Sequence, residues 1–226
     1  MASAQTATLS RRFTPRRIVE VVVLVAVVVA MVLCTKFLTP AELATIAPKP
    51  FDPAGIAQGL FDRAQSELPS RATDLGKVVP AIQSDPKTAA DTYRAVSPNE
   101  NAYVFPVRAT GTVVEATDAS LRIKVDGVSE QTPVLVPLTT AVNGSVLRDA
   151  MGFKFADAPG QTDYQYVADE LKQRMLADVA SSVPDAKALQ GKQVEVVGVV
   201  SVITTGGGPV PRAKPVNIQP VSVKAA

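Results

Sequence analysis

The longest uninterrupted run of apolar side chains lies near the N-terminus. The fifteen residues from Val21 to Thr35 carry no charge, and more than half of them are valine. The surrounding 21-residue segment 18–38 contains only two charged residues, Glu20 and Lys36, one near each end. As a helix it would be about 31 Å long, which matches the hydrocarbon core of a bilayer. The pattern predicts a single transmembrane helix over residues 18–38.

Proline and aspartate organise the next part of the chain. Residues 39–50 contain three prolines, which predict an extended tether. The pairs Asp52-Pro53 and Asp85-Pro86 each combine a capping acid with a proline suited to the first helical position. Residues 51–100 therefore form a predicted short helical subdomain. Its helices are expected from Pro53 to Pro69, over Thr73–Ile82 with a stop near Pro80, and over Pro86–Tyr93.

From Asn101 onward the apolar positions alternate, as is typical of strands. Between the third and fourth strands, an apolar stripe from Tyr164 to Val179 predicts an amphipathic helix of about 17 to 19 residues. Thr162 and Gln165 have capping-box spacing at its start. The predicted strands are Val104–Ala116, Leu121–Val125, Val134–Leu138 with Pro137 indicating an edge strand, Gln193–Ile203 with a bulge at Gly198, and Asn217–Lys224.

This order of three strands, a helix and two strands is that of a five-stranded Greek-key barrel of the OB type. The predicted fold class is therefore α+β. A single transmembrane helix and a short helical subdomain precede an OB-like five-stranded β-barrel domain, residues 101–226, with one long amphipathic helix.

Charge is distributed unevenly. The basic tip, residues 1–17, holds Arg11, Arg12, Arg16 and Arg17, whereas the chain beyond residue 36 has 18 basic and 20 acidic residues. By the positive-inside rule the tip is cytoplasmic, and the C-terminal domain lies outside the cytoplasm. We expect a single-pass protein of the cytoplasmic (inner) membrane, contacting lipid through residues 18–38. The nearly neutral body argues against a nucleic-acid partner.

Three fates are open to the apolar segment. A cleaved signal peptide needs small residues directly after it, and the nearest, at residues 45–47, lie too far away. Lipidation would use Cys34, but bulky Leu33 precedes it where that processing requires a small residue. An uncleaved anchor is the preferred interpretation.

Composition excludes several kinds of chemistry. The chain has no His and one Cys, which rules out His-based triads, intramolecular disulfides and Cys-rich zinc sites. The glycines 206–208 lack the context of a phosphate-binding loop and are interpreted as part of a mobile hairpin loop over Thr204–Pro211. The acids at 157, 163, 169 and 170 lack calcium-loop spacing. We expect no catalytic residues, no metal, no cofactor and no enzyme activity.

One polar motif stands apart, between the third strand and the long helix. Gly144–Gly152 contains adjacent Arg148 and Asp149, and Gln161 and Tyr164 follow. These four residues are the candidates for binding a ligand or a partner. Alternatively, Arg148 and Asp149 pair with backbone and hold the chain crossing together, which is the preferred interpretation.

The same motif carries a resemblance to a known family. The chain resembles the predicted periplasmic lipoproteins whose genes neighbour ribose-type sugar ABC transporters, a family without a proven activity. The resemblance rests on Thr35-Lys36, Phe51-Asp52-Pro53, Val79-Pro80-Ala81-Ile82, the Gly-x-x-x-Arg-Asp-Ala-x-Gly run at 144–152, Gln161 with Tyr164, Gly191-Lys192 through Val197-Gly198, and Pro220-Val221.

The resemblance implies a membrane-anchored extracytoplasmic accessory or binding protein, associated with a sugar transporter permease or a sugar-binding protein. The alternative is an envelope scaffold protein that binds other membrane proteins and no small molecule.

Overall fold

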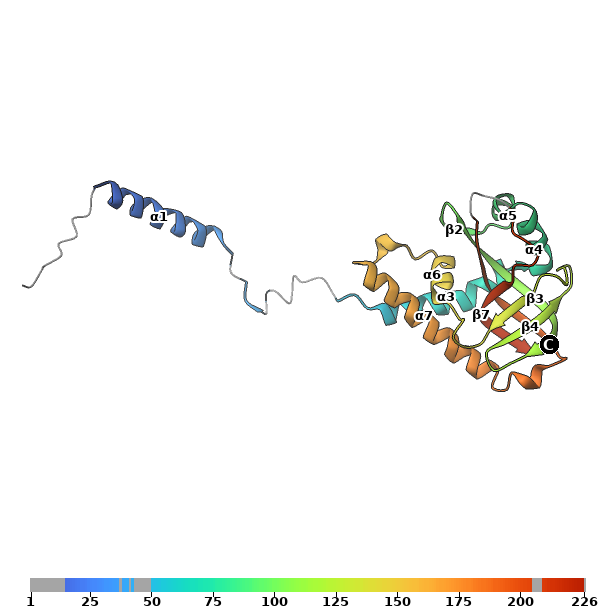
Figure 1. Ribbon diagram of the computed structural model, residues 1–226. Coiled ribbons are helices and arrows are strands. Elements are labelled where there is room, and N and C mark those ends of the chain that lie inside the picture. The colour runs from blue at the N-terminus through green and yellow to red at the C-terminus, as the bar shows by residue number, and fades with distance from the viewer. Residues whose placement is uncertain (1–14, 37, 41, 43–49, 205–208, 226) are drawn as a thin grey trace, which may run out of the picture. The chain divides into compact units, whose positions relative to one another are not determined.

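The computed structural model describes residues 15–36, 38–40, 42, 50–204 and 209–225 (Figure 1). The chain divides into two units, Met1–Pro50 and Phe51–Ala226. The predictions for the basic tip before Pro15, for most of the tether and for the glycines 206–208 lie outside the described residues.

Helix α1, Pro15–Cys34, is long and apolar enough to cross a membrane. Arg16 Nε lies 3.5 Å from Glu20 Oε1, one turn away, so the acid near the start of this helix has a cationic partner. At the other end the Thr35 hydroxyl donates to a carbonyl of the last turn at 2.6 Å. The helix begins and ends earlier than the predicted span 18–38, because proline suits its first position and Thr35 caps its last turn.

Seven strands form one sheet in the unit Phe51–Ala226. β3 pairs antiparallel with β4 and with β6, β4 pairs with β5, β6 pairs with β7, and β5 joins β7 in parallel. The pairings of these five strands therefore form a closed circuit, and their predicted order along the chain is confirmed. The strands are β1 (Thr73–Asp74), β2 (Val96–Asn99), β3 (Ala102–Ala116), β4 (Ser120–Val125), β5 (Val134–Pro137), β6 (Gln193–Ile203) and β7 (Val216–Ala225).

The prediction that Pro137 marks an edge strand is wrong, because β5 has a partner on each side. The parallel pairing of β5 with β7 covers only the first two residues of β5. Pro137 lies beyond them, at a position where no backbone N–H is needed for a hydrogen bond to β7. The bulge predicted at Gly198 is confirmed, and the extra residue lies opposite it, at Val221. A Cβ at position 198 would lie 2.3 Å from the Gln219 carbonyl oxygen, so this crossing requires glycine.

Five α-helices accompany the sheet in the described part of the unit. Asp52 and Asp85 cap α3 and α5 through their carboxylates, as predicted. Pro69 and Pro80 were expected to end helices, but both lie inside them. A proline removes one helical hydrogen bond, and the buried apolar faces of α3 and α4 hold those helices together despite that loss. The helices are α3 (Pro53–Arg71), α4 (Leu75–Ser84), α5 (Pro86–Thr92), α6 (Gly144–Ala150) and α7 (Gln161–Ser182).

The start of α7 differs from the prediction. The Tyr164 N–H donates to the Gly160 carbonyl at 3.0 Å, so Gly160 is the cap and Thr162 already lies in the first turn. The prediction of a capping box between Thr162 and Gln165 is therefore wrong. The Gln165 side-chain amide donates instead to Asp169 Oδ1 at 3.3 Å. The apolar stripe is confirmed, since its members from Val167 to Val179 are buried.

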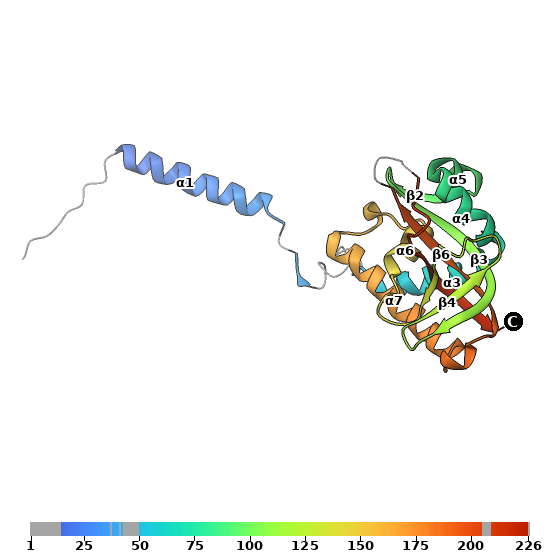
Figure 2. The same ribbon diagram turned by 45° about the vertical axis from the view of Figure 1, so that its right-hand side comes forward.

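Two hydrophobic clusters fill the unit. The first joins α4, α5 and the end of α7 to one face of the sheet, with Phe105, Leu121 and Ile218 among its buried members. The second lies between α3, α6, α7 and the other face, around Leu147, Leu171 and Met175. Figures 1 and 2 both show α6 and α7 on one side of the strands and α4 and α5 on another. The predicted helical subdomain thus shares both clusters with the strands.

Candidate functional site

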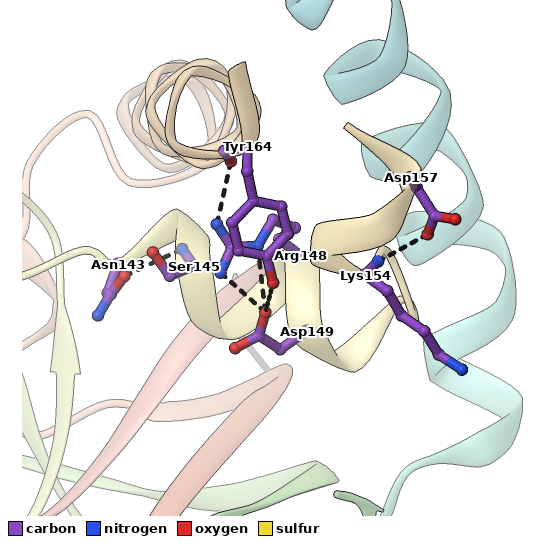
Figure 3. A network of polar contacts seen from close by, with 7 residues as sticks. All are labelled: Asn143, Ser145, Arg148, Asp149, Lys154, Asp157 and Tyr164. Carbon is purple, nitrogen blue, oxygen red and sulfur yellow. Dashed lines mark hydrogen bonds and ion pairs between the residues drawn. The ribbon is translucent and has the colours of Figure 1, made fainter. Parts of the chain in front are cut away.

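The chain between β5 and α7 is fixed to the sheet by hydrogen bonds of Asn143. Its Oδ1 accepts the Ser145 N–H at 3.0 Å and so caps α6, as Figure 3 shows. Its own N–H donates to Oε1 of the buried Gln219, on β7, at 2.7 Å. The start of α6 therefore has a defined position against the sheet.

Glycine at position 144 determines how closely α6 approaches α7. A Cβ there would lie 2.0 Å from the Ala168 carbonyl oxygen and 2.6 Å from the Lys172 nitrogen. The two helices pack backbone against backbone at this point, and Arg148 and Asp149 consequently lie beside the first turn of α7.

Arg148 is the one charged residue in the buried core of the described chain, at 5% exposure. Its Nε and Nη2 donate to Asp149 Oδ1 at 3.1 and 2.9 Å, and its Nη1 donates to the Tyr164 carbonyl at 3.1 Å (Figure 3). A buried guanidinium needs such partners, because an unpaired charge in the interior is costly.

Tyr164 completes this network from α7. Its hydroxyl donates to Asp149 Oδ1 at 3.2 Å, and its ring centroid lies 3.5 Å from Arg148 Cζ, a cation–π contact. Burial raises the pKa of the Tyr164 hydroxyl, and the nearby Asp149 carboxylate contributes to the rise. The phenol therefore stays protonated and remains a donor at neutral pH.

Two further aromatic rings surround Tyr164. Phe153 lies nearly parallel to it, with ring centroids 6.0 Å apart, and Phe155 meets it edge-on at 5.6 Å. Phe153 is half-buried, whereas Phe155 is 57% exposed. Neither phenylalanine is among the four candidate residues predicted from the sequence. The available signal was the gathering of four aromatic residues within 153–166 in a chain with few of them.

The structure brings together Arg148, Asp149 and Tyr164 but not Gln161. Gln161 is exposed at the first residue of α7 and takes no part in the described contacts of the network. Asp149 Oδ1 accepts from Arg148 Nε and Nη2 and from the Tyr164 hydroxyl, while the Asp149 side chain remains 20% exposed. In this arrangement a ligand would have to use the open part of the Asp149 carboxylate.

A second polar region lies over β4, where a groove of about 450 Å³ is bordered by two ion pairs. Arg122 Nη1 lies 3.8 Å from Glu115 Oε2, and Lys124 Nζ lies 2.6 Å from Glu130 Oε1. This second contact lowers the pKa of Glu130 and raises the pKa of Lys124. The four candidate residues do not line this groove. The alternation of apolar and polar residues in β4 indicated that Arg122 and Lys124 face outward, but it did not indicate which acidic residues they contact.

Among the described residues, no group of three or more His, Cys, Asp or Glu side chains is placed to hold a metal ion. Cys34 is exposed at the last residue of α1.

A family model described as "Predicted periplasmic lipoprotein (DUF2291)" matches residues 23–223. The chain belongs to this family. The match begins within α1, includes Cys34 and covers nearly all of the compact unit. The family's description and the apolar N-terminal helix fit membrane anchoring with an extracytoplasmic domain.

Comparison with solved structures shows the fold. A crystal structure of an OB-fold protein from Thermotoga maritima MSB8 matches with a TM-score of 0.65 at 18% identity, over 79% of this chain and 100% of that chain. At this identity the likeness concerns the fold alone. No curated protein matches the chain.

Proposed function

We propose that this protein is an accessory or binding protein of the cytoplasmic membrane that works beside a sugar ABC transporter. In this proposal α1 is a single-pass anchor with its N-terminus in the cytoplasm. The unit Phe51–Ala226 is then an OB-like five-stranded barrel outside the cytoplasm. Its partners are the transporter permease or a sugar-binding protein, and it catalyses no reaction.

The observation that carries the proposal is the division of the chain into a membrane-length helix and a separate compact unit. The connection from Thr35 to Pro50 can span about 58 Å at most. An anchor of this kind keeps a binding unit close to the membrane. The basic residues at and before the start of α1 support the proposed orientation.

Two anchors are compatible with this placement. The bulky Leu33 favours a retained helix, whereas the family description favours a lipid on Cys34. The mass of the purified protein distinguishes them. A retained helix gives the full chain, and lipidation gives a product that begins at acylated Cys34.

Binding is favoured over catalysis because the groups of the polar network are engaged with one another. Arg148 and Tyr164 both donate to Asp149, so neither offers a free nucleophile or base. The surface of the compact unit, including the groove over β4, is left for contacts with another protein.

Co-purification tests the proposal. The full chain, tagged after Ala226, is cross-linked in the membrane and purified in detergent, and the captured proteins are identified by mass spectrometry. We expect a sugar transporter permease or sugar-binding protein, cross-linked to residues of the compact unit. A matched chain in which residues 18–38 are replaced by an unrelated membrane helix should capture the same protein. Capture that depends on the native helix would place recognition in the membrane instead.

An envelope scaffold is the second candidate. It is favoured by Arg148, because this guanidinium is buried and hydrogen-bonded within the protein and is therefore inaccessible to small ligands. Repeated capture of envelope proteins other than transporter components would support the scaffold and overturn the transporter association.

A further inference from the structure

The chain between α6 and α7 contains a stretch that bonds only to itself. In Lys154–Pro159, which includes the one-turn helix η1 (Phe155–Asp157), the Asp157 N–H donates to the Lys154 carbonyl at 3.0 Å. The Ala158 N–H donates to the Phe155 carbonyl at 3.2 Å, and the Lys154 N–H donates to Asp157 Oδ2 at 2.7 Å. Within the described residues, no hydrogen bond or ion pair joins this stretch to another element.

One side chain connects the stretch to the rest of the unit by a ring contact. Phe155 meets the Tyr164 ring at a centroid distance of 5.6 Å and an interplanar angle of 77°. Phe155 is nevertheless 57% exposed, and most of its neighbours in the stretch are exposed as well. The stretch is therefore held by a contact that contributes little burial.

Glycines flank the stretch. Gly152 has φ +77°, a conformation that favours glycine, and a Cβ at that position would meet nothing within 4 Å. Glycine is thus required there by the backbone and not by crowding. Gly160 is extended and also lies in open surroundings. Phe153, between Gly152 and the stretch, stacks on Tyr164 and packs against the second cluster, so it fixes the chain just before Lys154.

We propose that Lys154–Pro159 is a flap, latched by Phe155 on Tyr164, that opens while the rest of the unit stays folded. Opening uncovers the part of the Tyr164 ring that Phe155 contacts, near the partly exposed Asp149 carboxylate, while Phe153 and Arg148 stay against the ring. That surface suits a group with an apolar face and hydrogen-bond donors. The flap is independent of the transporter association.

Hydrogen exchange of the full chain in detergent tests the flap, with Phe155→Ala as the variant. The Asp157 and Ala158 amides should exchange about 2- to 13-fold faster, the range expected for loss of one aromatic pair. Tyr166→Ala is the matched control. Tyr166 is similarly exposed, at 53%, but lies on α7 outside the described ring contacts. It should leave these amides unchanged.

Three results would contradict the proposal. Unchanged exchange in Phe155→Ala would show that Phe155 is not a latch, and an equal rise throughout α7 would show general unfolding. Nitration of Tyr164, followed by mass spectrometry, provides a second readout. It should become faster in Phe155→Ala and not in Tyr166→Ala. Faster exchange without faster nitration would contradict the uncovering of Tyr164.

Discussion

Replacing Arg148 by methionine should destabilise the compact unit by about 3 kcal/mol. Methionine keeps an apolar stem and removes a guanidinium that makes three hydrogen bonds of 2.9–3.1 Å and lies 3.5 Å from the Tyr164 ring centroid. Breaking a buried ion pair costs about 3–5 kcal/mol. The Asp149 side chain is 20% exposed and can recover water, which places the loss at the lower end of that range.

The assay is thermal unfolding of the unit Phe51–Ala226. A loss of this size should lower the melting temperature by about 6–12 °C in a domain of this length. Arg148→Lys keeps the charge but not the planar group that bonds Asp149 twice, so it should lose about half as much. Val196→Asp places a charge in the fully buried interior and should abolish folding, which shows that the assay detects loss of the core.

An unchanged melting temperature in Arg148→Met, together with loss of partner capture by the full chain, would refute the reasoning. Arg148 would then serve a ligand or partner, and the loop would be the functional site.

Three further substitutions test other parts of the account. Gly144→Ala should destabilise by about 1–3 kcal/mol in urea unfolding, because its Cβ would lie 2.0 Å from the Ala168 carbonyl oxygen. Burial raises the pKa of Asp178, so the wild-type chain loses stability as pH rises through that pKa. The free energy of unfolding of Asp178→Asn, measured by urea titration, should therefore rise relative to that of the wild type between about pH 3 and pH 7. Tyr164→Phe should remove one phenol that ionises above about pH 10, which an absorbance titration measures. It should also reduce the loss of stability at alkaline pH.

Local patterns were sufficient for much of the fold. The apolar run of α1, the capping acids Asp52 and Asp85 and the stripe of α7 each encode structure within a few turns of chain. The predictions from Pro80 and Pro137 were wrong. Packing against distant elements lets the helix continue past Pro80, and pairing with a distant strand gives the strand of Pro137 a second partner.

Pairing between distant segments was harder to foresee. β1 and β2 are too short to show a period, and both are strands only through their pairing with β3. The parallel contact of β5 with β7 joins segments about 80 residues apart and involves two residue pairs. Such a contact leaves almost no local signal.

The candidate site was predicted in part. Adjacent Arg148 and Asp149 were visible as a charged pair in a connection, and Tyr164 followed at the start of a helix. That Arg148 and Tyr164 both donate to Asp149 Oδ1 depends on the close crossing at Gly144, which a sequence pattern does not contain. The role of Phe155 depends on the same crossing, because its contact partner lies on α7.

A reporter that is active only outside the cytoplasm, fused after Ala226, tests the central claim most directly. The account places the compact unit outside the cytoplasm, so the fusion should be active and should lose activity when residues 18–38 are deleted. A second reporter that is active only in the cytoplasm should be silent at the same position. Activity of that second reporter in the intact chain would contradict the account, because it would place the unit Phe51–Ala226 inside the cell.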